Sequence, residues 1–253
     1  MHYLVGDIGN TLTKISILNK NFKIIKSFNI ETNKLIKSNN LKLFFNKIMS
    51  TKTKKKILFS SVVPSIYKKI KVYLNKKKHK VFEIKELDFK KIIKLNIKKT
   101  NQIGSDRIAN AVGSYEYYKK NCLIIDFGTA TTFDVVKSPG VYDGGVIAPG
   151  IKQSIISLNK STALLPLLNL KSKSKSYGKN TKDALNAGFI WGYQGLINNI
   201  IKKITLSSKN NYKVILTGGY AKLFKKYINK KCVIDDNVTI KGIITIFKKF
   251  LIW

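Results

Sequence analysis

The chain has 253 residues, enough for one large domain or two small ones, and its hydrophobic content of 44% is ordinary for a globular protein. Its net charge of +35 suggests a phosphate-rich partner, but the lysines come with many Ile and Asn, as drift toward A/T-rich codons produces. Arg107 is the only arginine, and base readout favours Arg, so we expect no specific nucleic acid.

Histidine and cysteine are too scarce for several common kinds of site. The two histidines argue against histidine triads and His-ligated zinc. Cys122 and Cys232 open apolar stretches and fit no metal spacing, so we interpret both as small buried residues in a reducing compartment. The N-terminus does not resemble a signal peptide, and no apolar run approaches a membrane span. We therefore expect a soluble, cytoplasmic protein without a membrane partner.

Apolar runs that end in turn residues predict strands, and apolar residues at helical spacing predict helices in the segments between them. Predicted strands lie at 3–8, 14–18, 22–28, 55–64, 80–84, 121–136 (two strands joined by a turn) and 212–219. Predicted helices lie at 40–49, after Pro64, within 103–118, at 151–158, 182–207, after Gly219 and at 241–252. The Gly- and Pro-containing segment 143–150 and the polar segment 171–180 are expected to be loops. The alternation predicts an α/β protein.

The two halves contain an internal repeat. When "YLVGDIGNTLTKISI" is placed over "LIIDFGTATTFDVV", Asp7 falls on Asp126 and Gly9 on Gly128, with Asn10 over Thr129. Each copy is a strand, an Asp-x-Gly turn and a second strand. We therefore expect two similar domains, at 1–118 and 119–253, each with one such turn.

An Asp-x-Gly turn can bind phosphate and metal. The glycine permits close backbone approach, and the following N–H groups and hydroxyls can hold phosphate oxygens, while the Asp can hold a metal directly or through water. One such turn is common in hairpins, but two in register could clamp a triphosphate and Mg²⁺ across a central cleft. At Gly218 and Gly219, where another strand ends, a flat ring could lie against backbone that no side chain covers. The alternative is that these glycines only form a tight turn between strand and helix. No Walker A sequence is present.

In the stretch "GSDR", Gly104 and Ser105 would open a helix that begins near Asp106. Asp106 would lie where the helix dipole favours its ionised form, with an unperturbed pKa of about 4. It could cap the helix, or it could orient an attacking hydroxyl and accept its proton late in phosphoryl transfer. Arg107 could pair with a nearby acid, or bind a substrate carboxylate with both prongs of its guanidinium.

Six motifs in order resemble those of type III pantothenate kinases, a family of the acetate kinase, sugar kinase, Hsp70 and actin superfamily. They are "DIGNT" (7–11), "SSVVP" (60–64), "GSDR" (104–107), "DFGTATTFD" (126–134), "GGVIAPG" (144–150) and "TGG" (217–219). The resemblance implies a duplicated actin-like (ribonuclease H-like) ATPase fold. It also implies transfer of the γ-phosphoryl of ATP to pantothenate, the first step toward coenzyme A, with Mg²⁺, a monovalent cation (K⁺ or NH₄⁺) and a homodimer near "GGVIAPG".

The resemblance also implies residue roles. Asp106 would be the base, Asp126 would hold the monovalent cation, and Asp7 would hold Mg²⁺, possibly through water. The expected ATP-binding residues are Asp7, Ile8, Gly9, Asn10, Thr11, Leu12, Thr13, Lys14, Thr129, Gly218 and Gly219. The expected pantothenate-binding residues are Gly104, Ser105, Asp106, Arg107 and Thr181, the last often supplied across the dimer interface.

One departure and two alternatives remain at this stage. The family commonly has Tyr and Pro shortly before Gly-x-Asp-Arg, where this chain has Ile97 and Thr100, so one wall of the pantothenate pocket is expected to differ. A basic, DNA-associated accessory transcription factor of the same fold would not need Asp106 together with both Asp-x-Gly turns. A sugar kinase or anhydro-sugar kinase of the superfamily is usually longer and leaves "GSDR" unexplained.

Overall fold

The computed structural model describes residues 2–171 and 176–252, so part of the polar segment 171–180 lies outside the described residues. The chain forms two compact units. Unit 1 comprises Met1–Lys119, Pro139–Tyr142 and Asn237–Trp253, and unit 2 comprises Lys120–Ser138 and Asp143–Asp236. The last helix, α7 (Val238–Leu251), therefore belongs to unit 1, whereas the sequence places it in the second half.

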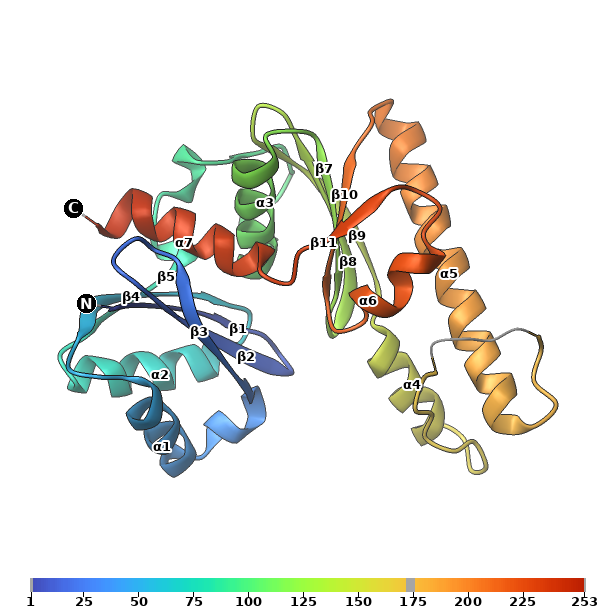
Figure 1. Ribbon diagram of the computed structural model, residues 1–253, viewed down its shortest axis with the longest axis horizontal. Coiled ribbons are helices and arrows are strands. Elements are labelled where there is room, and N and C mark those ends of the chain that lie inside the picture. Colours follow the sequence, from blue (N-terminus) through green and yellow to red (C-terminus); the bar gives the residue numbers. More distant parts are fainter. Residues whose placement is uncertain (1, 172–175, 253) are drawn as a thin grey trace. The chain divides into compact units, whose positions relative to one another are not determined.

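Unit 1 is built on a five-stranded sheet of order β3-β2-β1-β4-β5. Its strands are β1 (His2–Ile8), β2 (Leu12–Leu18), β3 (Ile24–Glu31), β4 (Thr53–Ser61) and β5 (Lys80–Glu83). The first three pair antiparallel, and β4 and β5 run parallel to β1. Helices α1 (Ser38–Ile48) and α2 (Pro64–Lys76) cover one face with a core that includes Phe45 and Phe59. The helix α7 lies on the opposite face, packed against α3 (Ser105–Tyr118) (Figure 1).

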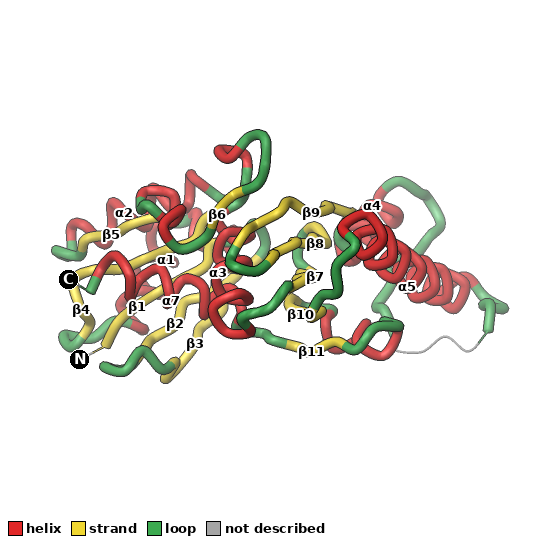
Figure 2. Tube along the Cα trace, turned by 90° about the horizontal axis from the view of Figure 1, so that it is seen from above, coloured by secondary structure: helices red, strands yellow, loops and turns green. Residues whose placement is uncertain are grey.

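Unit 2 contains the central strands of the second sheet, whose order is β11-β10-β7-β8-β9-β6. The strands are β6 (Lys94–Leu95), β7 (Cys122–Phe127), β8 (Ala130–Lys137), β9 (Val141–Pro149), β10 (Lys213–Gly218) and β11 (Cys232–Ile234). The short β6 pairs with Val141 and Tyr142, which belong to unit 1. Helices α4 (Ile151–Lys160), α5 (Thr181–Ser208) and α6 (Ala221–Phe224) share one apolar core with these strands, and Figure 2 shows α4 and α5 along one side of them.

Most predicted elements are confirmed, and the clearest error is β9. The segment 143–150 is predicted as a loop because it contains two glycines and a proline, yet most of it lies in this nine-residue strand. Its neighbour β8 supplies the backbone pairing that its own composition does not favour. The short strands β6 and β11 are absent from the prediction for a related reason, since two or three residues carry no readable periodicity.

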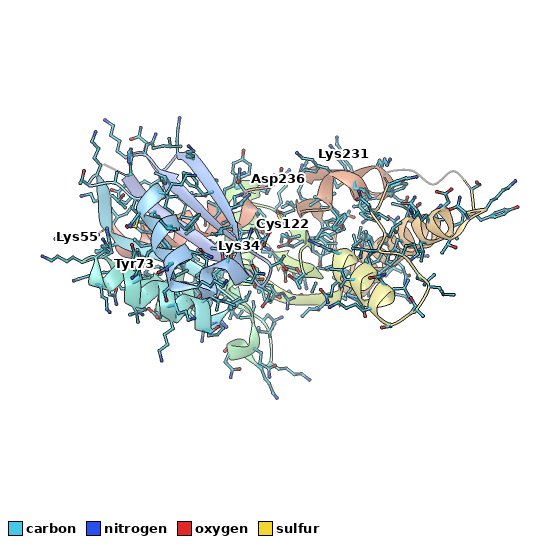
Figure 3. The ribbon with its side chains drawn as sticks, turned by 90° about the horizontal axis from the view of Figure 1, so that it is seen from below. Lys34, Lys55, Tyr73, Cys122, Lys231 and Asp236 are labelled. Atoms are coloured by element: carbon cyan, nitrogen blue, oxygen red, sulfur yellow. The ribbon has the colours of Figure 1, made fainter. Side chains whose placement is uncertain are left out.

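The surface chemistry agrees with the composition. Lysines such as Lys55 and Lys231 lie exposed on the two units (Figure 3). Cys122 is buried and Cys232 half-buried, and both are free thiols. Within residues 2–171 and 176–252, no helix has the length and hydropathy that crossing a membrane requires.

Candidate active site

The first Asp-x-Gly turn, Asp7–Lys14, is the first candidate phosphate-binding turn and is called the first phosphate turn below. It joins β1 to β2 and is held by several hydrogen bonds. Gly9 N–H donates to Leu12 O (3.1 Å), and Thr32 Oγ1 donates to Gly9 O (2.7 Å). Thr13 Oγ1 lies 2.9 Å from Thr32 Oγ1. The side chains of Ile8 and Thr13 are fully buried, so these two candidates could contact ATP only through their backbone. Residues 10–12 are exposed at the tip of the turn.

Asp7 and Lys14 lie directly opposite each other on the antiparallel strands β1 and β2, which places their side chains on the same face of the sheet. Ser60 Oγ donates to Asp7 Oδ1 at 2.8 Å. Lys14 Nζ donates to Asn237 Oδ1, also at 2.8 Å. Sequence reasoning did not select Ser60 as a partner of Asp7, although it lies in the "SSVVP" motif. Nor did it select Asn237, which carried no signal because it is 223 residues from Lys14.

The start of α3 is connected to the phosphate turn through Val62. Val62 N–H donates to Ile8 O at 3.0 Å. A Cβ added to Gly104 would collide with Asp106 Oδ1 and would lie 3.4 Å from Val62 Cγ1. Gly104 is therefore needed for the Asp106 carboxylate to fold back over the helix start, where its Oδ1 accepts the Arg107 N–H at 2.8 Å. Unit 1 thus brings Asp106 and the phosphate turn Asp7–Lys14 to one region.

The pKa of Asp106 differs from the expectation. Burial raises it above its ordinary value, and this effect outweighs the hydrogen bonds from backbone N–H groups and the charges of Arg107 and Lys85, which lower it. The pKa of Asp106 therefore lies above the unperturbed value of about 4, because packing removes water from the carboxylate. A raised pKa suits a proton acceptor that works near neutral pH.

Arg107 lies over an aromatic ring. Its Cζ lies 5.7 Å from the centroid of Tyr142, whose side chain is 1% exposed. A flat guanidinium stacks on a ring and keeps its donors at its edge, whereas an ammonium offers neither the plane nor the fork. This contact is a structural reason for an arginine at this position.

Two other candidate residues have very different surroundings. Ser105 is 1% exposed, and its Oγ makes no hydrogen bond of good geometry within the described part of the chain, so any substrate contact would come from its backbone. Thr181 is the exposed first residue of α5 in unit 2, directly after Asn180, which caps that helix through Asp183 N–H at 3.0 Å.

The second phosphate turn lies in unit 2, between β7 and β8. Asp126 lies near the end of β7, and Thr129 is exposed in the turn. Gly218 has a φ of +86°, and a Cβ there would lie 2.6 Å from Phe127 O and 2.7 Å from Asp126 Oδ1. Gly219 N–H donates to Phe127 O at 3.1 Å. The turns around Asp126 and Gly218 are therefore in direct contact.

These oxygens suit the expected cations. Asp126 Oδ1 and Phe127 O line a cradle that only glycine leaves open, and a carboxylate with a carbonyl is a donor set for K⁺. Mg²⁺ is commonly bound by one or two carboxylates together with phosphates and water, so the single carboxylate of Asp7 is compatible with it. No group of three or more His, Cys, Asp or Glu that could hold a metal occurs in the described ranges.

Comparisons with known proteins agree with this description. The family model for type III pantothenate kinase matches residues 3–203. A type III pantothenate kinase from Pelagibacter ubique (strain HTCC1062) is 44% identical, and the match covers 95% of this chain and 96% of that protein.

Two solved structures are similar in fold. The activator of the 2-hydroxyisocaproyl-CoA dehydratase from Clostridium difficile, with bound ADPNP, has a TM-score of 0.60 at 14% identity and covers 98% of this chain and 95% of its own. The inorganic polyphosphate/ATP-glucomannokinase from Arthrobacter sp. strain KM has a TM-score of 0.53 at 12% identity, with 98% and 97% covered. These likenesses concern the fold alone, which is the duplicated actin-like ATPase fold. From the family match and the Pelagibacter relative, the chain belongs to the type III pantothenate kinase family.

Proposed function

We propose that this protein transfers the γ-phosphoryl group of ATP to the hydroxyl of pantothenate and forms 4′-phosphopantothenate, the first step of coenzyme A biosynthesis. The observation that carries the proposal lies within unit 1. Val62 N–H donates to Ile8 O of the phosphate turn, and a Cβ added to Gly104 of the "GSDR" motif would lie 3.4 Å from Val62 Cγ1. The two motifs are therefore close in space although almost a hundred residues separate them. Family membership supports the same reaction.

Asp106 is the proposed base. The pantothenate hydroxyl oxygen bonds to the γ-phosphorus, the bond from that phosphorus to the ADP oxygen breaks, and the hydroxyl proton moves to the Asp106 carboxylate. The transition state of such transfers is loose, so the base mainly orients the hydroxyl and receives the proton late. The raised pKa of Asp106 favours that acceptance.

We assign the ATP phosphates to the two Asp-x-Gly turns. The halves 1–118 and 119–253 are the proposed actin-like domains, and each supplies one turn. Asp7 would hold Mg²⁺, directly or through water, and Asp126 would hold K⁺ or NH₄⁺. Bound Mg²⁺ would supply charge neutralisation on the phosphates. Thr129, Gly218 and Gly219 would contact the nucleotide from the second half.

Arg107 is the proposed clamp for the pantothenate carboxylate. Its guanidinium lies over the Tyr142 ring, and the planar fork of an arginine matches a carboxylate with two parallel hydrogen bonds. Thr181 of α5 is also proposed to contact pantothenate. Its side chain is exposed, which would allow it to reach the pantothenate bound to a neighbouring protomer. We expect the enzyme to work in the cytoplasm, where ATP is available.

The proposed homodimer uses the surface of β9 and α4. A groove of about 760 Å³ lies there, lined in part by Pro149, Ser154 and Leu158. Ile147 is 63% exposed beside it. We expect light scattering to give a dimer for the native protein and a monomer for Ile147→Asp. The control is Leu206→Asp, which alters an equally exposed residue on α5 and should leave the dimer intact.

A direct assay tests the reaction. Purified protein is incubated with ATP, Mg²⁺, K⁺ and pantothenate, and phosphopantothenate is measured by mass spectrometry, with pantothenate omitted as control. We expect product only in the complete mixture. Absence of product from protein that is folded and binds ATP would refute the proposal.

The DNA-associated alternative is less well supported, because the similar sequences are named as kinases. The net charge of +35 nevertheless predicts nonspecific binding to DNA at low salt. A specific role requires that binding survive at about 0.2 M salt, where lysine–phosphate contacts lose most of their affinity.

A further inference from the structure

Glu83 is a buried carboxylate that the proposed chemistry does not use. It ends β5 and is 8% exposed. Its Oε2 accepts the Lys85 N–H at 2.7 Å, and its Oε1 accepts the Ser61 N–H at 3.3 Å. Burial raises the pKa of Glu83, and these donors oppose the rise. Burial of a carboxylate costs free energy unless its oxygens accept hydrogen bonds or pair with a cation.

Two segments of the candidate site meet at this carboxylate. The first is the turn after β4, where Ser61 N–H donates to Glu83 and Val62 N–H donates to Ile8 O at 3.0 Å. The second is the start of α3. The Ser105 hydroxyl interacts with the Glu83 carboxylate and lowers its pKa, although the contact falls short of a hydrogen bond of good geometry. Ser105 directly precedes Asp106.

We propose that Glu83 is a positioning residue for Asp106. Its carboxylate holds the Ser61–Val62 turn and the first turn of α3 in one arrangement, and thereby sets where the Asp106 carboxylate lies relative to the phosphate turn. No side-chain cap is present at the start of α3, so the helix itself does not supply this constraint. The inference rests on the proposed function for its kinetic consequence. Glu83 itself does not contact substrate.

Glu83→Gln is the informative variant. Both oxygens of Glu83 accept backbone N–H groups, and an amide must turn its NH₂ toward one of those donors. We expect kcat to fall at least tenfold, with the KM for ATP changed less than twofold. The control is Glu86→Gln, which alters an exposed neighbour whose oxygens contact Tyr67, Lys71 and the Glu83 N–H. Glutamine keeps one acceptor oxygen for that N–H and leaves the Glu83 carboxylate in place, so kcat should change less than twofold.

Ser105→Ala provides a milder second variant, because it removes only one hydroxyl. If Glu83 acts through Ser105, the double variant should lose no more kcat than Glu83→Gln alone. Multiplication of the two losses, or a kcat for Glu83→Gln equal to that of Glu86→Gln, would overturn the proposal.

Hydrogen exchange separates this proposal from the proposed reaction. In Glu83→Gln, the amides of residues 103–108 should exchange at least tenfold faster than in the native protein and in Glu86→Gln. This readout needs no turnover. If the native protein makes no phosphopantothenate but exchange responds as expected, the proposed function fails and the positioning role stands. Unchanged exchange at these amides refutes the positioning role whatever the activity.

Discussion

Ser60 Oγ donates a 2.8 Å hydrogen bond to Asp7 Oδ1, which links the end of strand β4 to the carboxylate of the first phosphate turn. Ser60 is fully buried and comes from β4, which runs parallel to β1. The bond orients the carboxylate that we assign to Mg²⁺. This hydrogen bond explains why the first residue of the "SSVVP" motif is a serine.

Removal of this hydroxyl should weaken the use of magnesium. A hydrogen bond to a charged group is worth roughly 1.5–3 kcal/mol, so Ser60→Ala should lower kcat/KM for Mg·ATP by about tenfold or more. Initial rates at varied Mg²⁺ measure the effect. The control is Ser27→Ala, which removes a hydrogen bond of the same length, between the hydroxyls of Ser27 and Ser16, in the same sheet. It should leave these rates unchanged. Equal behaviour of the two variants would contradict the assignment.

Asp106→Asn should abolish turnover and leave ATP binding intact. Because the pKa of Asp106 is raised, the acid limb of the native kcat/KM profile should lie above pH 4, where an ordinary carboxyl titrates. Below that raised pKa the carboxyl carries a proton and accepts none. Measurement of rates from pH 4 to 9 locates the limb, and near-normal turnover of the variant would remove Asp106 as the base.

Asp106→Asn should stabilise the fold although it abolishes turnover. A carboxyl whose pKa is raised by burial stabilises the fold in its protonated form and loses that contribution as pH rises through the raised pKa. Asp106→Asn should therefore melt above the native protein at pH 8, by roughly 2–4 °C for each kcal/mol relieved. The difference should shrink as pH falls below the raised pKa. A lower melting temperature at pH 8 would contradict the burial effect.

Arg107→Lys should raise the KM for pantothenate about tenfold, with a smaller effect on the KM for ATP, because lysine keeps the charge but loses the fork. Tyr142→Leu should act in the same direction, since it removes the ring under the guanidinium. Tyr142→Phe keeps that ring and serves as the matched control. Steady-state kinetics with pantothenate varied decide the matter, and an unchanged KM in Arg107→Lys would refute the carboxylate clamp.

Adjacent glycines offer a sharp comparison at the second turn. Gly218→Ala should cost on the order of 1–3 kcal/mol of unfolding free energy, because its φ of +86° and the nearby oxygens leave no room for a methyl group. The K⁺ concentration for half-maximal activity should rise at least tenfold, since Asp126 Oδ1 must move. Gly219→Ala meets nothing within 4 Å and should be nearly neutral. Urea unfolding and K⁺ titration of both variants measure the two effects.

The amino-acid sequence by itself determined the local features of this protein. Strand–turn–strand patterns around Asp7 and Asp126, and the helix that begins within "GSDR", follow from residue types within a few positions. Such features depend on backbone propensity and glycine conformation, which the chain carries with it. The family resemblance is also carried by short motifs.

Only the tertiary structure decided which distant residues form hydrogen bonds with the residues of those motifs. Asn237 reaches Lys14, and Ser61 meets Glu83, through strand order and helix packing that no local pattern encodes. Burial of Thr13, and the raised pKa of Asp106, likewise depend on what other elements pack above them. Most of segment 143–150 is a strand because β8 pairs with it. Hydrogen bonding, burial and desolvation act between residues distant in sequence, and folding is what brings those residues together.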